Sequence, residues 1–369
     1  MQYREFGKTG ERVSVLGFGC MRFPGKDGAV DVDEAVRMMR YAMDNGVNYL
    51  DTAYFYHDGK SEEIVGKALK NGYRDKTLLA TKSPIYSIKA ADDFDRFLDT
   101  QRKRLDTDVI DFYLLHAVNR NDWENVVLKF GLLDKMQKAK DAGVIRHIGF
   151  SFHDNLDAFL TIVDGYDSWE FCQIQMNYVD VKNQAQMAGM EYAAKKGLGV
   201  IIMEPLRGGK LACPPSRVQA LFPDEKPPVE WALDFLWNRP EVGIILSGMS
   251  SMEQVQQNLA YADAARVGML DAQMLSVFDQ ARKVYETTAL VPCTKCAYCM
   301  PCPFGLDIPA IYEAYNASAL GNRDKVQEQY EAISVRADAC KACKKCEARC
   351  PQAILSSQVM PQIAKFFTR

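Results

Sequence analysis

Short apolar runs recur along the first 285 residues, and stretches with helical spacing separate them. Most runs are apolar on both faces, which is the pattern of buried parallel strands. We predict eight strands, at residues 13–18, 47–51, 77–82, 109–115, 145–150, 171–175, 199–203 and 242–246. The helical stretches include 32–43, 61–69, 92–105, 132–142, 184–196, 229–237 and 252–262.

This alternation of strands and helices predicts an α/β fold, a (β/α)8 TIM barrel over residues 1–286. Residues 3–13 are predicted to form a hairpin ahead of the barrel. The alternative is a doubly wound open sheet, but residues 17–21 lack the third glycine of its dinucleotide fingerprint. Ser61 is predicted to cap the helix that follows it, because acidic residues occupy the next two positions.

Composition narrows the class of protein. Apolar residues make up 48% and charged residues 25% of the chain, and the formal net charge of -3 comes with no cluster of basic residues typical of nucleic-acid binding. No apolar run approaches the roughly 18 residues that a membrane helix needs. The N-terminus is polar and lacks the apolar core of a signal peptide. We therefore expect a cytoplasmic protein without nucleic-acid or membrane partners.

The eleven cysteines are unevenly distributed. Cys20, Cys172 and Cys213 are scattered, and we expect them to be small buried side chains. The others form two motifs, Cys293, Cys296, Cys299 and Cys302 before Pro303, and Cys340, Cys343, Cys346 and Cys350 before Pro351. Such crowding in one tail indicates metal binding rather than a disulfide scaffold.

The second motif has the spacing of the bacterial ferredoxin run, and the first has two residues instead of three before its fourth cysteine. Eight thiolates suit two 4Fe–4S clusters, so we predict a small C-terminal ferredoxin-like iron–sulfur domain over residues 287–369. Which cysteine binds which cluster stays open. Structural zinc is the alternative, but zinc sites usually separate two cysteine pairs by a longer loop.

Four polar residues stand at or just beyond the ends of predicted strands, where barrel enzymes carry their chemistry. Asp51, Lys82 and His116 end the second, third and fourth strands, and Tyr56 follows Asp51. A nearby ammonium favours the phenolate, so Lys82, held by Asp51, is expected to lower the pKa of Tyr56. His116 would orient a carbonyl oxygen. Each residue alone also fits ordinary packing or solvation, but their coincidence indicates a catalytic site.

The first 285 residues resemble the aldo/keto reductase superfamily in stretches 4–24, 50–69, 78–84, 108–118, 145–152, 173–180, 201–211 and 245–259. The resemblance implies nicotinamide-dependent reduction of carbonyls, with Tyr56 as the acid. It also implies a dinucleotide near Gly19, Cys20, Met21, Asp51, Ser151, Gln173, Met203, Leu206, Gly208, Gly248, Gln254 and Asn258. The tail is similar to ferredoxin-type dicluster domains, in the version fused to aldo/keto reductases.

Several positions depart from the family's pattern. Phe152 replaces a frequent Asn, and Met203 replaces an aromatic ring that stacks on the nicotinamide. Gly248 and Gln254 stand where members that prefer NADPH place Lys and Arg. The cofactor is therefore NADPH, NADH or another redox group on this reading.

Three functions follow from the sequence. The first is hydride transfer between a nicotinamide cofactor and a small carbonyl substrate. The second is electron transfer between the barrel cofactor and a ferredoxin-type carrier through the clusters, which needs a converter from two-electron to one-electron steps. Lys341, Lys344, Lys345 and Arg349 are then either solvated charges or a docking site for an acidic carrier. The third is a non-enzymatic binding subunit, which the four strand-end residues argue against.

Overall fold

The structure is a computed structural model that describes residues 1–26, 29–286, 290–319 and 323–368. Contacts divide the chain into two compact units. The first comprises Met1–Pro205 and Val229–Asp271, and the second comprises Leu206–Pro228 and Ala272–Arg369. The predicted domain boundary after Glu286 adjoins residues 287–289, which lie outside the described part of the chain, so it stays a prediction.

The first unit is a closed barrel of eight parallel strands, which confirms the predicted fold. In order around the barrel they are β3 (Leu16–Gly19), β6 (Tyr49–Asp51), β7 (Leu78–Ser83), β8 (Ile110–Val118), β9 (Ile145–Phe152), β10 (Phe171–Gln175), β11 (Gly199–Met203) and β12 (Val242–Ser247). The predicted strand 13–18 is divided. Its first part belongs to β2 (Arg12–Ser14), which pairs antiparallel with β1 (Tyr3–Glu5) as the predicted hairpin. A second small hairpin joins β4 (Gly25–Lys26) to β5 (Ala29–Val30).

Aromatic side chains fill the barrel interior at the end where the strands begin. The ring of Phe6, which follows β1, lies 5.6 Å from Phe112 and 6.1 Å from Phe171 between ring centroids. A Cβ atom on Gly199 or Gly243 would stand 2.6 Å from the Phe6 ring, so glycine at both positions leaves the ring its space. This packing closes the N-terminal end of the barrel, and the opposite end is left for chemistry.

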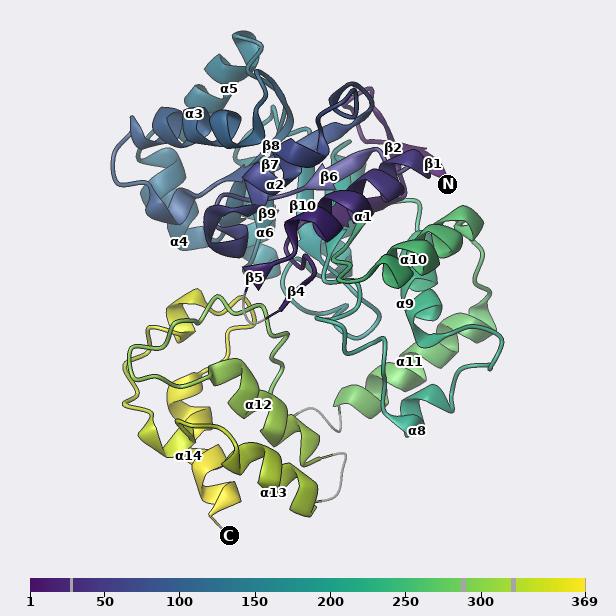
Figure 1. The fold of residues 1–369 in the computed structure, drawn as a ribbon, viewed down its shortest axis with the longest axis vertical. Helices are drawn as coiled ribbons and strands as arrows, with labels where there is room; N and C mark the ends of the chain where they lie inside the picture. Colours follow the sequence, from purple (N-terminus) through teal and green to yellow (C-terminus); the bar gives the residue numbers. More distant parts are fainter. Residues whose placement is uncertain (27–28, 287–289, 320–322, 369) are drawn as a thin grey trace. The chain divides into compact units, whose positions relative to one another are not determined.

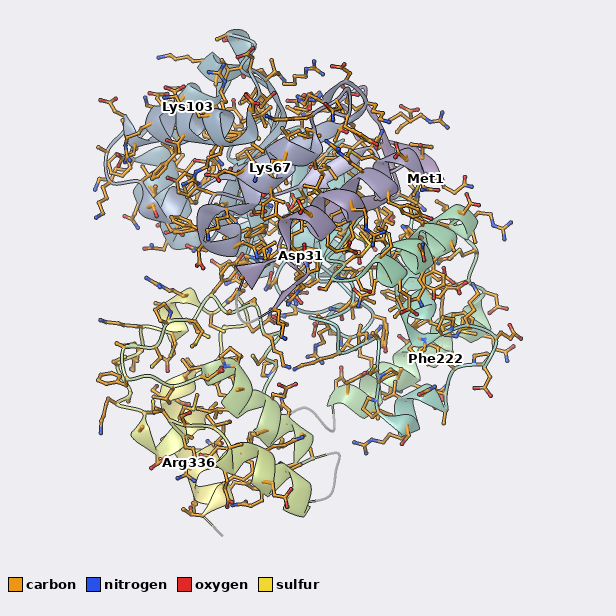
Figure 2. The ribbon with its side chains drawn as sticks, viewed as in Figure 1. Met1, Asp31, Lys67, Lys103, Phe222 and Arg336 are labelled. Carbon is orange, nitrogen blue, oxygen red and sulfur yellow. The ribbon has the colours of Figure 1, made fainter. Side chains whose placement is uncertain are left out.

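Helices surround the barrel, as Figure 1 shows for α1, α3 and α10. Those of the barrel repeat are α1 (Val32–Asp44), α2 (Ser61–Ala68), α3 (Asp93–Leu105), α5 (Leu132–Asp141), α6 (Leu156–Asp164), α7 (Gln186–Lys195), α9 (Pro228–Trp237) and α10 (Met252–Ala264). A short α4 (Arg120–Asp122) runs into a π-helix (Trp123–Leu128). Lys67 and Lys103 mark the exposed faces of α2 and α3 (Figure 2). None of the described helices is long and apolar enough to cross a membrane.

The predicted cap at Ser61 is wrong. Ser61 is the first residue of α2 itself, and the helix has no side-chain cap. Its buried hydroxyl instead bonds the carbonyl oxygen of Cys20 at 3.0 Å and the hydroxyl of Thr52 at 2.8 Å. Ser61 therefore ties the start of α2 to the ends of β3 and β6. By contrast, Asp31 caps α1 by accepting a bond from the Glu34 N–H (Figure 2).

The second unit is helical in its described residues. It contains α8 (Ser216–Gln219), α11 (Ala272–Glu286), α12 (Ile308–Ala317), α13 (Arg323–Glu331) and α14 (Ser356–Phe367). Tyr312 of α12 and Ile363 of α14 belong to its buried core, and the hydroxyl of Tyr312 lies 2.7 Å from that of Ser356.

Two of the three scattered cysteines match the expectation. Cys20 and Cys172 are fully buried, but Cys213 is exposed, so the expectation for Cys213 was wrong. Cys213 precedes Pro214 and Pro215 in an irregular connection whose buried side chains are those of Leu211 and Val218.

Candidate active site

The four predicted catalytic residues come from neighbouring strands of the barrel. Asp51 ends β6, Lys82 lies near the end of β7, and His116 lies near the end of β8. Asp51 pairs in register with Ala80, and Lys82 pairs with Leu114, so the three strand ends are adjacent. Tyr56 begins the 3₁₀ turn Tyr56–Gly59 that follows β6.

A buried ion pair forms the centre of this group. The Lys82 ammonium lies 2.5 Å from the Asp51 carboxylate and donates to the Thr52 carbonyl oxygen at 2.7 Å. Both side chains are almost fully buried, at 1% and 3% exposure. The same ammonium lies 3.5 Å from the Tyr56 hydroxyl. The structure thus brings Asp51, Lys82 and Tyr56 together, as the sequence predicts.

The protonation of Tyr56 differs from the expectation. Burial raises the pKa of Tyr56 well above its usual value, and the negative charge of Asp51 raises it further. The predicted lowering by Lys82 is therefore wrong for the resting site, because desolvation of a phenolate outweighs the ammonium. The phenol is protonated at neutral pH, which is the state a proton donor needs.

His116 is the second group able to contact a carbonyl oxygen. Its ring lies 6.0 Å from the Tyr56 ring and 5.8 Å from the Tyr86 ring, between centroids. Burial lowers the pKa of His116 well below its usual value, and the charges of Lys82 and His153 lower it further. The imidazole is therefore neutral and can donate an N–H bond to an oxygen without adding a charge.

A buried polar network behind Lys82 was not predicted from the sequence. The Glu62 carboxylate accepts bonds from Thr81 at 2.7 Å and from Gln101 at 2.8 Å. Gln101 also donates to the Lys82 carbonyl oxygen at 3.0 Å, and Arg104 donates to Glu62 at 3.2 Å. The network fixes the backbone that carries Lys82. In the sequence, Glu62 resembles any acidic residue in the first turn of a helix. Only its complete burial in the structure indicates that it supports the backbone at Lys82.

Three residues predicted to contact the dinucleotide lie on neighbouring strands. Gln173 of β10 pairs in register with Ser151 of β9, and Met203 ends β11. The Gln173 amide nitrogen lies 3.8 Å from the Met203 sulfur, and the Ser151 hydroxyl accepts a bond from the Ala117 N–H at 2.7 Å. The buried amide oxygen of Gln173 has no hydrogen-bond partner among the described residues. A nicotinamide carboxamide offers the N–H donor that this oxygen lacks, so the residues fit the group.

The residues predicted near the rest of the dinucleotide lie at the β3 and β12 ends of the barrel. Gly19 lies against the Ser247 carbonyl, and Asn258 of α10 donates to the Ser247 hydroxyl at 2.9 Å. The Cys20 thiol contacts the Met39 sulfur at 3.9 Å, and burial raises the pKa of that thiol. Met21 follows it and is half-buried.

A cation missed by sequence reasoning stands beside Gly248. A Cβ atom on Gly248 would lie 3.2 Å from the side-chain carbons of Arg22. Gln254 carries no charge, and its side-chain oxygen accepts from the Ser250 N–H at 2.8 Å. Arg22 was missed because it comes from the connection after β3, far in sequence from Gly248 and Gln254.

Leu206 and Gly208, also predicted to contact the dinucleotide, belong to the second unit. Gly208 has φ +65° and lies directly against the carbonyl oxygen of Thr294, because a Cβ atom there would be 2.2 Å from that oxygen. Leu206 and Gly208 follow Met203 by three and five positions along the chain.

The tail cysteines border two small cavities in the second unit. One is lined by Cys293, Cys296, Cys299, Cys346 and Cys350, and the other by Cys302, Cys340, Cys343 and Cys346. The two motifs have the same backbone pattern, since Lys295 and Ala297 in the first and Ala342 and Lys344 in the second have positive φ.

Comparisons with known proteins agree with both parts of the chain. Residues 15–216 match the model of the aldo/keto reductase family, and residues 292–355 match a 4Fe-4S dicluster domain. L-galactose dehydrogenase of Arabidopsis thaliana is 28% identical over 301 residues, covering 75% of this chain and 92% of that protein. The holo form of aldo-keto reductase AKR11C1 from Bacillus halodurans has a TM-score of 0.64 and 25% identity, covering 76% of this chain and 96% of that one. An aldo-keto reductase from Klebsiella pneumoniae in complex with NADPH has a TM-score of 0.63 and 23% identity, covering 76% and 95% of the two chains.

Proposed function

The chain belongs to the aldo/keto reductase family, and from this premise we propose that it reduces a small carbonyl compound to an alcohol, or catalyses the reverse reaction, with NADPH or NADH. The observation that carries this proposal is the group formed by Asp51, Lys82, Tyr56 and His116. A protonated phenol beside a buried ammonium and a neutral imidazole is the equipment needed to protonate a carbonyl oxygen.

The nicotinamide, when bound, supplies the hydride that attacks the carbonyl carbon. Tyr56 donates its hydroxyl proton to the carbonyl oxygen, and the Lys82 ammonium stabilises the phenolate that remains. Asp51 keeps Lys82 charged and in place, since the two are 2.5 Å apart. His116 donates an N–H bond that orients the oxygen toward Tyr56.

Gln173, Ser151 and Met203 would hold the nicotinamide, because the Gln173 oxygen lacks a donor among the described residues. For the phosphates, Gly19, Cys20, Met21, Gly248, Gln254 and Asn258 surround the ends of β3 and β12, and Leu206 and Gly208 complete the set implied by the family. The Klebsiella pneumoniae structure contains NADPH. The side-chain carbons of Arg22 pack against Gly248, and we propose that its guanidinium binds phosphate there, which favours NADPH ahead of NADH.

The substrate panel should include aldoses. Phe55 and Tyr86 are exposed, at 46% and 49%, and their rings lie 5.7 Å apart between centroids. The Tyr86 ring also lies 5.8 Å from the His116 ring. Exposed rings next to a catalytic group suit the apolar faces of a sugar, and one relative is an L-galactose dehydrogenase.

The test is anaerobic turnover of the purified full chain with NADPH and with NADH, using a panel of aldehydes, ketones and aldoses. Oxidation of either cofactor that depends on a carbonyl substrate is expected. Binding of the cofactor without turnover of any compound in the panel would contradict the proposed reduction and favour a non-enzymatic binding subunit.

We further propose two 4Fe–4S clusters in the tail. Cys293, Cys296, Cys299 and Cys350 would bind one, and Cys302, Cys340, Cys343 and Cys346 the other, following the two cavities they line. The thiolates are the soft ligands that such clusters take, and the fourth cysteine of each run crosses to the other cluster. Iron analysis should give about eight iron atoms per chain, and Cys302→Ser should lose the second cluster before the first.

Electron transfer through these clusters is the second candidate function. Cys343 is exposed, and so are Lys341, Lys344, Lys345 and Arg349 around it. An exposed cluster ligand within a basic surface suits one-electron exchange with an acidic ferredoxin-type carrier. A reduced carrier would pass one electron to the oxidised cluster near Cys343. Stopped-flow mixing with a reduced ferredoxin tests this: bleaching of the cluster absorption within milliseconds to seconds is expected, and no bleaching would exclude direct exchange.

A further inference from the structure

The segment 206–211 has a backbone conformation that local sequence does not favour. Arg207, Gly208 and Gly209 have φ of +51°, +65° and +90°, three successive residues in the left-handed region. Within the segment, the Gly209 and Leu211 N–H groups donate to the Leu206 carbonyl oxygen at 3.0 and 3.1 Å. Left-handed residues that are not glycine persist only where surrounding structure holds them.

The structure that holds this segment is the loop of the first cysteine motif. The Lys210 ammonium donates to the carbonyl oxygen of Cys293 at 2.5 Å. The backbone of Gly208 lies against the Thr294 carbonyl, too close for any side chain at position 208. Thr294 is 2% exposed. Two consecutive residues of the cysteine loop therefore contact two residues of the segment.

The same loop is shaped around its thiols. Cys293 accepts a bond from the Lys295 N–H on its sulfur at 3.4 Å, and Lys295 and Ala297 have φ of +58° and +62°. A loop that wraps a thiol in this way is ordered by the cluster that the thiol binds, as small metal domains generally are. Folding of this loop around its cluster would hold the Cys293 carbonyl oxygen that Lys210 contacts.

We propose that the cluster bound by Cys293 orders the segment Leu206–Lys210: it holds the Cys293–Thr294 backbone, and that backbone holds the segment in the conformation that the family's pattern assigns to dinucleotide binding. Lys210 is a positioning residue in this arrangement, acting through its bond to the Cys293 carbonyl oxygen. The inference rests on the proposed function, because Leu206 and Gly208 are assigned to the dinucleotide through the family. Loss of the cluster would then weaken dinucleotide binding while the catalytic group of the barrel stays intact.

The first experiment compares Lys210→Met with the wild-type full chain, both reconstituted anaerobically and matched for iron content. NADPH and NADH binding is measured by nicotinamide fluorescence, and amide exchange of residues 206–212 by mass spectrometry. We expect iron to be retained, the dissociation constant to rise about tenfold, as loss of a charge-assisted hydrogen bond predicts, and exchange in the segment to accelerate. Lys210→Arg, which keeps a cationic donor, should restore most of the binding.

Lys365→Met is the matched control. It removes the same charge from an exposed position on α14 of the same unit, and its binding and exchange should equal those of the wild type. Equal binding and exchange in Lys210→Met and wild type would overturn the proposal.

The second experiment separates this inference from the proposed function. Amide exchange of residues 206–212 is compared between the cluster-loaded chain and the same chain stripped of iron by a chelator. Slower exchange in the loaded chain is expected, and it would support the structural coupling even if the wild type binds no dinucleotide. Equal exchange in the two states would overturn the coupling. Because this comparison uses the wild-type chain, it remains decisive even if Lys210→Met fails to retain iron.

Discussion

Replacing Tyr56 with Phe removes the proposed proton donor and little else. The Tyr56 hydroxyl receives only a long contact from Lys82, at 3.5 Å, whereas Lys82 keeps its bonds to Asp51 at 2.5 Å and to Thr52 at 2.7 Å. The variant should therefore lose less than about 1 kcal/mol of unfolding free energy. General acid catalysis contributes about 10²–10⁴-fold, so kcat/KM should fall by that factor, equivalent to roughly 3–5 kcal/mol in the barrier.

The assay is carbonyl-dependent oxidation of NADPH under anaerobic conditions, together with cofactor titration and urea unfolding. Tyr86→Phe is the matched control, because it removes a phenolic oxygen from a ring 5.8 Å from His116 that is not bonded to Lys82. Its kcat/KM should fall less than tenfold. Wild-type turnover by a folded Tyr56→Phe variant would refute the assignment of the acid.

The pH dependence of kcat/KM is a second test of whether the Tyr56 phenol is protonated. Burial raises the pKa of Tyr56 well above its usual value, so the phenol stays protonated and kcat/KM should not fall between pH 7 and pH 9. A phenol whose pKa had been lowered by Lys82 would lose its proton in this range, and reduction would decline. A fall in kcat/KM over this pH range, with NADPH binding unchanged, would show that burial does not control the pKa of Tyr56.

Three other changes have defined outcomes. Asp51→Asn leaves the buried Lys82 ammonium without its carboxylate and should lower the unfolding free energy by about 3–5 kcal/mol in urea denaturation, besides reducing turnover. Burial lowers the pKa of His153 from 6.5 to about 4, so its contribution to stability is present above pH 6.5 and is lost as pH falls toward 4. His153→Gln should therefore lose less stability than the wild type, by roughly 3 kcal/mol, between pH 7 and pH 4; an identical loss would contradict this. Lys344→Glu should slow cluster reduction by an acidic ferredoxin and flatten its dependence on ionic strength, whereas Lys365→Glu should not; equal rates would exclude docking at Cys343.

The fold was predictable because its pattern is local and repeated. Eight apolar runs, each the length of a buried strand, alternate with amphipathic stretches, and the structure places a barrel strand at each run. The small errors have local causes. Ser61 was taken for a cap because its own hydroxyl and the acids after it fit that pattern, but tertiary contacts with Cys20 and Thr52 use the hydroxyl instead.

The proximity of the candidate site residues was predictable, whereas their protonation was less so. Asp51, Lys82 and His116 stand out because charged and polar groups at the ends of buried strands are costly unless they have a use. Their proximity follows from strand order. The direction in which the pKa of Tyr56 shifts could not be predicted from the sequence. It depends on how far the fold buries the hydroxyl, and residue spacing does not specify that burial.

Sequence alone determined the barrel, the four strand-end groups and the two cysteine motifs, since each rests on periodicity or on short spacings along one stretch of chain. Only the tertiary structure decided that Glu62 and Gln101 support Lys82, that Arg22 stands beside Gly248, and that Lys210 reaches Cys293. Those pairs join residues between 19 and 226 positions apart, and contacts over such separations are set by how the elements pack in space.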